Sequence, residues 1–166
     1  MLAAVALAGA AWAAPVGCVE AAPAARLVSV INAGEAAFRA VDRAASLAAE
    51  AQAATLLSCL GRPLERGEAG RVRRMEAIGR FLSGDRDGSR DAWRAAKRAD
   101  PGVQPAAGPI GHPLLEDDVR SMSTAADMLR AVPLPSELRL WVDGLDVRQV
   151  PVGRPFVAWT VTTVRS

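Results

Sequence analysis

Apolar residues recur at helical spacing through the first two thirds of this chain. Between residues 24 and 60 they return every three or four positions, as in Leu27 and Ile31, which is typical of helices with one buried face. The span is long for one globular helix, so we expect a break at Val41-Asp42, with Asp42 as the N-cap of the second segment. This stretch therefore predicts an antiparallel helix pair.

A second helix pair is predicted from Arg71 to Pro101, after a short linker at residues 64–70. Gly84-Asp85 provides a tight turn between its helices, and Asp100-Pro101 stops the second one. The apolar face of the first helix contains Val72, Met75, Ile78 and Leu82, and that of the second contains Ala92, Trp93, Ala96 and Ala99. A pair with two apolar stripes cannot bury both alone, so we expect it to pack against neighbours.

A fifth helix is predicted after the glycine- and proline-rich segment that follows Pro101. Pro113 suits the first turn, and three acids at residues 116–118 follow where the helix dipole favours them. The apolar stripe runs from Leu115 to Leu129, and the next residue, Arg130, closes the helix. The helical domain would then cover residues 24–131.

The pattern changes to that of strands over residues 136–166. Glu137 to Val142 alternates polar and apolar residues, Asp143-Gly144 is a turn signal, and Phe156 to Val164 is rich in β-branched residues. Two short strands are marginally stable, so they would pack on the helices, pair with a partner or belong to a larger β domain. The predicted fold is mainly α, with about five helices in antiparallel pairs and a small C-terminal β-hairpin or partial β module.

Composition adds few constraints on function. Aromatic residues make up 4% of the chain, so we expect helices to pack closely through small side chains. The 20 basic and 18 acidic side chains give a net charge of +2. This balance does not provide the strong positive field that nucleic-acid binding usually requires, so no nucleic-acid partner is expected.

The first 14 residues are almost wholly apolar and uncharged. They are too few to span a bilayer, and Ala11-Trp12-Ala13 fits the small-x-small rule for secretory cleavage. We interpret residues 1–14 as a signal peptide, which leaves no transmembrane span in the mature chain. The alternative is a buried N-terminal helix, because the segment lacks a basic residue near its start.

Export would place the two cysteines in an oxidising compartment. Cys18 and Cys59 are then candidates for a disulfide that closes a loop of about 40 residues and stabilises by roughly 3–4 kcal/mol. A lipid anchor on Cys18 is an alternative, because Val16-Gly17-Cys18 matches part of a lipobox, although Pro15 stands where such a box has leucine. The third possibility is that Cys18 and Cys59 are two unpaired thiols.

The second pair resembles a tetratricopeptide repeat. The positions that match the motif at the expected spacing are Ala77, Gly84, Asp85, Ser89, Trp93, Ala96, Asp100 and Pro101. Glu76 and Arg80 depart from it, since the repeat usually has large apolar residues there. The pair before it looks like a degenerate repeat, and the tail from Leu138 looks like part of a PEGA-type β-module. Together these features resemble exported bacterial envelope proteins.

The sequence contains no motif for catalysis, a cofactor or a metal. Its single histidine, His112, lies in a loop between Gly111 and Pro113 without a second ligand nearby. The sequence has no phosphate-binding loop, nucleophile elbow or dinucleotide-binding glycine pattern. We therefore expect a protein that is not an enzyme and needs no cofactor.

Four arginines of the predicted third helix are candidates for binding a partner. In tetratricopeptide proteins the first helices of each pair line the binding groove, and arginines there can hold carboxylates with two hydrogen bonds. The motif alignment places Arg71 and Arg74 in this groove, whereas the apolar stripe directs Arg73 and Arg80 furthest from the core. A simple solvated face is the alternative to both.

The predicted function is a non-enzymatic protein-interaction or scaffolding module in the periplasm or cell envelope. It would dock an acidic or extended segment of a protein partner on the helix pairs, and the exposed edge of the β-tail offers a second contact. A structural envelope spacer, anchored through the β-tail, is the alternative, and an enzyme of unknown type is the third.

Overall fold

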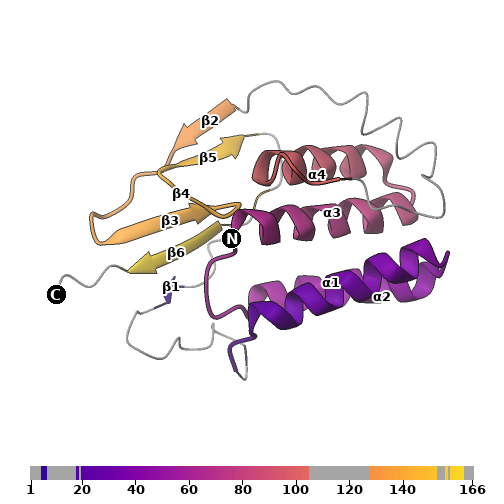
Figure 1. Ribbon diagram of the computed structural model, residues 1–166. Helices are drawn as coiled ribbons and strands as arrows, with labels where there is room; N and C mark the ends of the chain where they lie inside the picture. The colour runs from indigo at the N-terminus through magenta and orange to yellow at the C-terminus, as the bar shows by residue number, and fades with distance from the viewer. Residues whose placement is uncertain are drawn as a thin grey trace.

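The computed structural model describes residues 5–6, 18, 20–104, 128–152, 156 and 158–162. Within them the chain forms helices α1 (Ala24–Arg39), α2 (Arg43–Ser58), α3 (Arg66–Leu82) and α4 (Arg86–Ala99), and strands β1 (Val5–Ala6), β2 (Met128–Ala131), β3 (Leu138–Val142), β4 (Leu145–Val147), β5 (Gln149–Val152) and β6 (Ala158–Thr162). The helices form one part of the molecule and the strands lie at one end of them (Figure 1). The predicted fold, mainly α with a small C-terminal β part, is confirmed. None of the helices in the described part is long and apolar enough to cross a bilayer.

The helices form two antiparallel hairpins, α1–α2 and α3–α4, which stack on each other (Figure 1). Helix α3 contacts α1 and α2 of the first hairpin as well as its own partner α4. It is therefore the central helix, and its buried residues extend beyond the predicted apolar stripe to Ala69, Ala77 and Arg73. The packing of one hairpin on the next buries the stripes that neither pair could bury alone.

The two interhelix turns have the same structure at an offset of 43 residues. Val41 donates to the carbonyl of Phe38 as Gly84 does to that of Phe81, and both residues have positive φ, of 61° and 87°. The Asp42 side chain caps α2 by accepting from Ala45, as Asp85 caps α4 by accepting from Gly88. The predicted break at Val41-Asp42 and the turn at Gly84-Asp85 are confirmed, and the hairpins are structural repeats.

Many of the buried side chains between the helices are small. Ala92, Ala96 and Ala99 of α4 are buried, as predicted, and Trp93 beside them is 0% exposed. Helix α3 begins at Arg66, inside the segment assigned to a linker. A capping box starts it there, since Glu65 and Glu68 each bind the other's backbone N–H.

The strands form two sheets. The larger has the order β1-β6-β3-β4, in which β3 pairs antiparallel with both β6 and β4, while β1 pairs parallel with β6. Asp143 and Gly144, both with positive φ, form the two-residue turn between β3 and β4, as the turn signal predicts. The smaller sheet pairs β2 with β5 antiparallel.

Strand β2 corrects the predicted end of the fifth helix. Residues 128–131 were expected to end that helix, but they pair with β5, where Leu129 lies opposite Pro151. Pairing with a strand more than 15 residues further along overrides the local helical pattern. The β part therefore begins before residue 136. Most of the expected helix, with His112, lies outside the described residues.

The β part packs on the helices instead of forming a separate tail. Trp159 of β6 belongs to the same buried cluster as Leu27, Met75 and Trp93 of the helices. Gly144 lies against the start of α3, where a Cβ would come within 2.5 Å of the Arg66 backbone nitrogen. The first contact joins β6 to the helical core, and the second places the β3–β4 turn beside α3.

The predicted signal peptide is mostly outside the described residues. Its described residues, Val5 and Ala6, form β1 at the edge of the larger sheet. Cleavage near Ala13 stays a prediction.

Candidate functional site

A cleft of about 260 Å³ lies between α2 and α3, at the junction of the two hairpins. It is lined by Glu50, Ala53, Ala54 and Leu57 from α2 and by Val72, Arg73, Met75, Glu76 and Arg80 from α3. The cleft thus combines an apolar wall with two acids and two bases. Such a mixture of apolar surface and a few charged groups is what binding sites for small groups or side chains usually contain.

Glu50 enters this cleft because the residue of α3 opposite it is a glycine, Gly79. A Cβ at Gly79 would lie 2.7 Å from Cγ of Glu50, closer than two carbon atoms can approach. The glycine therefore allows α2 and α3 to come together with the glutamate between them. Its carboxylate makes no hydrogen bond or ion pair with any residue that the structure describes.

Glu50 also occupies a special place in the repeat. The 43-residue offset that relates Asp42 to Asp85 relates Glu50 to Trp93, which is completely buried in the second hairpin. Glutamate is much smaller than tryptophan, and Glu50 is only partly buried. Glu50 therefore lines the cleft at a position where the second hairpin has a larger, completely buried side chain.

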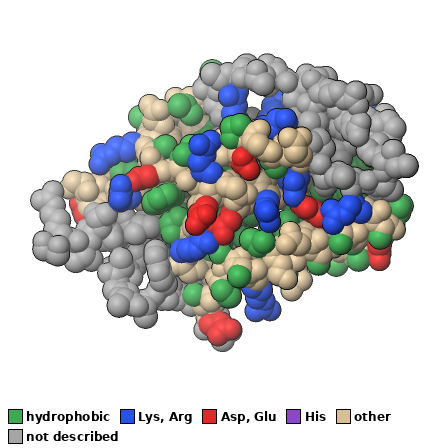
Figure 2. All heavy atoms as spheres, viewed as in Figure 1, with side chains coloured by type: hydrophobic (Ala, Val, Ile, Leu, Met, Phe, Trp, Pro, Cys, Tyr) green, Lys and Arg blue, Asp and Glu red, His purple; other side chains and the backbone are tan. Residues whose placement is uncertain are grey.

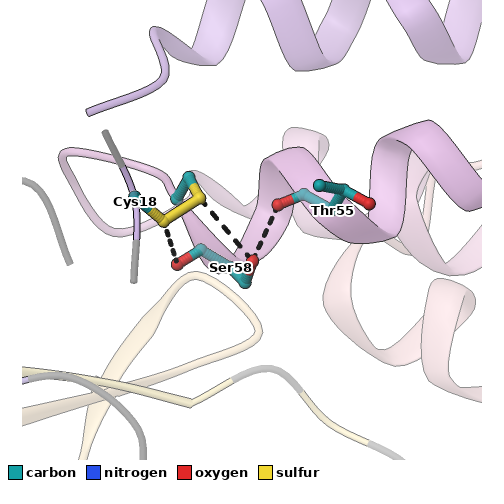
Figure 3. Close-up of a disulfide and its surroundings, with 4 residues drawn as sticks. Cys18, Thr55 and Ser58 are labelled. Atoms are coloured by element: carbon teal, nitrogen blue, oxygen red, sulfur yellow. Dashed lines mark hydrogen bonds between the residues drawn. A yellow bond between two sulfur atoms is a disulfide. The ribbon is translucent and has the colours of Figure 1, made fainter. Parts of the chain in front are cut away.

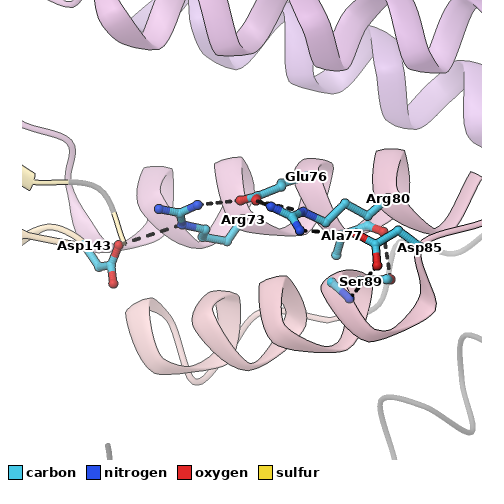
Figure 4. A network of polar contacts seen from close by, with 8 residues as sticks. Arg73, Glu76, Ala77, Arg80, Asp85, Ser89 and Asp143 are labelled. Atoms are coloured by element: carbon cyan, nitrogen blue, oxygen red, sulfur yellow. Dashed lines mark hydrogen bonds and ion pairs between the residues drawn. The ribbon is translucent and has the colours of Figure 1, made fainter. Parts of the chain in front are cut away.

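Charged side chains form a row along α3 beside the cleft (Figure 4). Glu76 stands in the middle and accepts from Arg73 Nη1 on one side and from Arg80 Nε, at 3.0 Å, on the other. Each arginine has a second acid: Arg73 Nε lies 4.0 Å from Asp143 Oδ1, and Arg80 Nη1 lies 3.3 Å from Asp85 Oδ2. Both guanidinium groups are therefore already paired within the chain.

The environment of Glu50 disfavours its charged form. Burial raises the pKa of the Glu50 carboxyl, and the negative charge of Glu76 raises it further, while the charge of Arg80 lowers it. Glu50 is thus a partly buried acid beside Glu76, and the nearby Arg80 is already bound to Glu76 and Asp85.

The arginines predicted to bind a partner have different surroundings from those expected. Arg73, which the apolar stripe directed outward, is 7% exposed, because Asp143 from the β3–β4 turn and Glu76 draw it into the junction with the β part. Arg80 is partly exposed in the row described above. Arg71 lies on the exposed surface of α3.

Arg74 is the other arginine assigned to the groove by the motif. Its Nε donates to Oε1 of the buried Glu35 at 2.8 Å, which joins α3 to α1, and its Nη1 donates to the carbonyl of Gln104. Arg73 and Arg74 are thus structural residues within this fold. The expectation from the apolar stripe that Arg73 points away from the core is wrong, and binding of a partner by Arg71, Arg74 or Arg80 stays a prediction.

Several of the residues assigned to the repeat motif form local contacts in the second hairpin. Ser89 is buried and donates to the Ala77 carbonyl at 2.8 Å (Figure 4). Asp100 ends α4 and accepts from Gly102, with Pro101 between them. In the first hairpin the equivalent serine, Ser46, is equally buried, but its hydroxyl has no partner among the described residues.

Cys18 and Cys59 form a disulfide with a Cα–Cα distance of 5.7 Å (Figure 3). It ties the segment before α1 to the end of α2, where Ala22 also donates to the Cys59 carbonyl at 2.7 Å. The predicted pairing is confirmed. A sulfur in a disulfide is unavailable for a lipid anchor, so the structure favours the disulfide over lipidation of Cys18.

Sequence reasoning missed Glu35, Glu50 and Asp143. Glu35 and Glu50 interrupt apolar helical stripes. An acid in such a stripe indicates a buried ion pair or a binding site, so the sequence does contain a signal for both residues. Asp143 was seen only as part of a turn, since nothing local relates it to Arg73.

Basic and acidic side chains are interspersed on the face shown in Figure 2, without a large area of one sign. Among the described residues, no group of three or more His, Cys, Asp or Glu side chains is arranged to hold a metal ion. Comparisons of the chain with protein-family models, curated proteins and solved structures found no match.

Proposed function

We propose that this chain is a non-enzymatic binding module, exported to the periplasm or cell envelope, that docks a segment of a partner protein on its helix pairs. The cleft between α2 and α3 carries this proposal. It combines an acid that has no hydrogen bond or ion pair among the described residues, an apolar wall and a place between two stacked hairpins.

The disulfide supports the export part of the proposal. Disulfides persist in oxidising compartments and are rare where thiols are kept reduced. Cys18 follows the proposed cleavage site, so the mature chain would keep the bond.

The arrangement of the helices supports a tetratricopeptide-like binding module. Two hairpins with the same turn stack so that α3 packs against both α1 and α2, as successive repeats do in such arrays. Repeat proteins of this kind present surfaces between adjacent hairpins, which suits the docking of a peptide segment.

Affinity capture from envelope extract tests this function. Ala54→Trp would fill the mouth of the cleft from an exposed position on α2, and Ala44→Trp makes the same change on an exposed residue of α2 that does not line the cleft. The proposal predicts that a partner captured by the wild type and by Ala44→Trp is lost with Ala54→Trp. Equal capture by all three proteins would contradict docking at the cleft. Circular dichroism and thermal melting of each variant show that it is folded.

A further inference from the structure

We propose that the cleft between α2 and α3 binds a cationic side chain, a lysine or arginine of an extended partner segment, with its charged group at Glu50. The inference rests on the proposed function and adds the chemistry of the partner. It departs from the acidic partner that the arginine-rich sequence of α3 suggests.

The balance of charge around the cleft favours a cation. Arg73 and Arg80 share Glu76 between them, and each also pairs with one further acid, Asp143 or Asp85. These three acids already exceed the two arginines by one negative charge. Glu50 adds a fourth negative charge, so the group is two charges short of neutrality.

A cation at Glu50 would also reduce the repulsion within the group. The carboxylates of Glu50 and Glu76 face the same cleft, and burial weakens the screening of each by water. A positive group placed against Glu50 converts this unfavourable arrangement into an ion pair. An acidic side chain in the same place would meet two carboxylates, and both arginines are already engaged.

The walls of the cleft suit the stem of such a side chain. Ala53, Ala54 and Leu57 of α2 face Val72 and Met75 of α3 across it. Lysine and arginine bury their methylene groups along apolar surface while the charged end reaches a polar partner. The cleft therefore matches both parts of a long basic side chain.

A titration with three peptides tests the inference on the full, disulfide-bonded chain. The probes are N-acetylated, C-amidated Ala-Ala-X-Ala-Ala, with lysine, norleucine or glutamate as X. Norleucine keeps the aliphatic stem without the charge, and glutamate reverses the charge. Binding is followed by the amide NMR shifts of residues that line the cleft.

The lysine peptide is expected to shift the signals of cleft residues and to bind about fivefold to tenfold more tightly than either of the others. Glu50→Gln should abolish this preference, whereas Glu20→Gln, the same substitution on an exposed residue outside the cleft, should keep it. The Glu50 variant removes a charge that is unfavourable to folding, so loss of binding would not reflect loss of structure.

Equal binding of the three peptides, tighter binding of the glutamate peptide, an unchanged preference in Glu50→Gln or no shift at the cleft would each overturn the inference. These results leave the proposed function separately testable. If a partner is still lost from Ala54→Trp in the capture experiment, the cleft binds a segment of other chemistry.

Discussion

Glu50 of α2 occupies the position in the first hairpin that Trp93 of α4 occupies in the second. The same 43-residue offset relates the turns that precede them, so the equivalence follows from backbone structure. One repeat fills this position with the bulkiest side chain of the core, and the other places there an acid that lines a cleft. Replacing packing by an unpaired charge costs stability, which is a common property of binding sites.

Glu50→Gln is expected to stabilise the protein at neutral pH, by about 1 kcal/mol at most. The raised pKa of Glu50 means that the folded state binds its proton more tightly than the unfolded state does. The stability of the wild type relative to Glu50→Gln should therefore rise as the pH falls through the raised pKa, and the difference should disappear below the ordinary glutamate range. Urea unfolding of both proteins across this pH range measures it. A variant less stable than the wild type at neutral pH would contradict the unpaired state of Glu50.

The two equivalent serines are expected to respond oppositely to replacement by alanine. Ser89→Ala removes the hydrogen bond to the Ala77 carbonyl and should destabilise by about 1 kcal/mol. Ser46→Ala removes a buried hydroxyl without a partner among the described residues, so it should be neutral or stabilising. Thermal and urea unfolding of the two variants provide the comparison, and each serves as the control for the other. Equal destabilisation by both would show that Ser46 has a partner.

The disulfide is expected to contribute about 3–4 kcal/mol, since it closes a loop across a sequence separation of 41 residues. Changing Cys18 and Cys59 together to serine should lower the free energy of unfolding by this amount while the helical circular dichroism remains. Mass analysis of the non-reduced protein, expressed in the periplasm, should show two hydrogens fewer than the reduced chain. Two free thiols in that sample would contradict the pairing.

Arg73 is expected to hold the β part against α3. Arg73→Met keeps an unbranched side chain but leaves the almost buried Asp143 without this cation, so a loss of about 3 kcal/mol is expected. Adding Asp143→Asn to Arg73→Met should restore part of the lost free energy of unfolding. The double-mutant cycle should give a coupling energy of about 1 kcal/mol between the two residues. Additive effects of the two changes would show that the 4.0 Å contact contributes no interaction energy.

The sequence was sufficient to predict the helix pairs because their signals are local. Asp42, Gly84 and Asp100 mark the ends of helices through their own side-chain or backbone properties, and the structure places them as predicted. The disulfide was predictable because the chain has two cysteines.

The site was not predictable because its parts are distant in the sequence. The apolar stripe predicts an exposed Arg73, because Asp143, which lies beside it in the structure, is 70 residues later in the sequence. The relation of Glu50 to Trp93 was hidden because tetratricopeptide repeats recur every 34 residues, whereas these hairpins are offset by 43. The local apolar pattern of β2 predicts a helix, because its partner strand β5 lies further along the sequence and does not contribute to that pattern.

Site-specific photo-crosslinking in bacterial cells that express the protein tests the central claim most directly. A benzophenone amino acid at position 54 would lie at the cleft, and the same residue at position 44 would lie elsewhere on α2. The proposed function predicts a crosslinked partner from position 54 that is absent from position 44, attached beside a lysine or arginine if the inferred chemistry holds. Crosslinks of equal yield from both positions, or from position 44 alone, would contradict docking at the α2–α3 cleft.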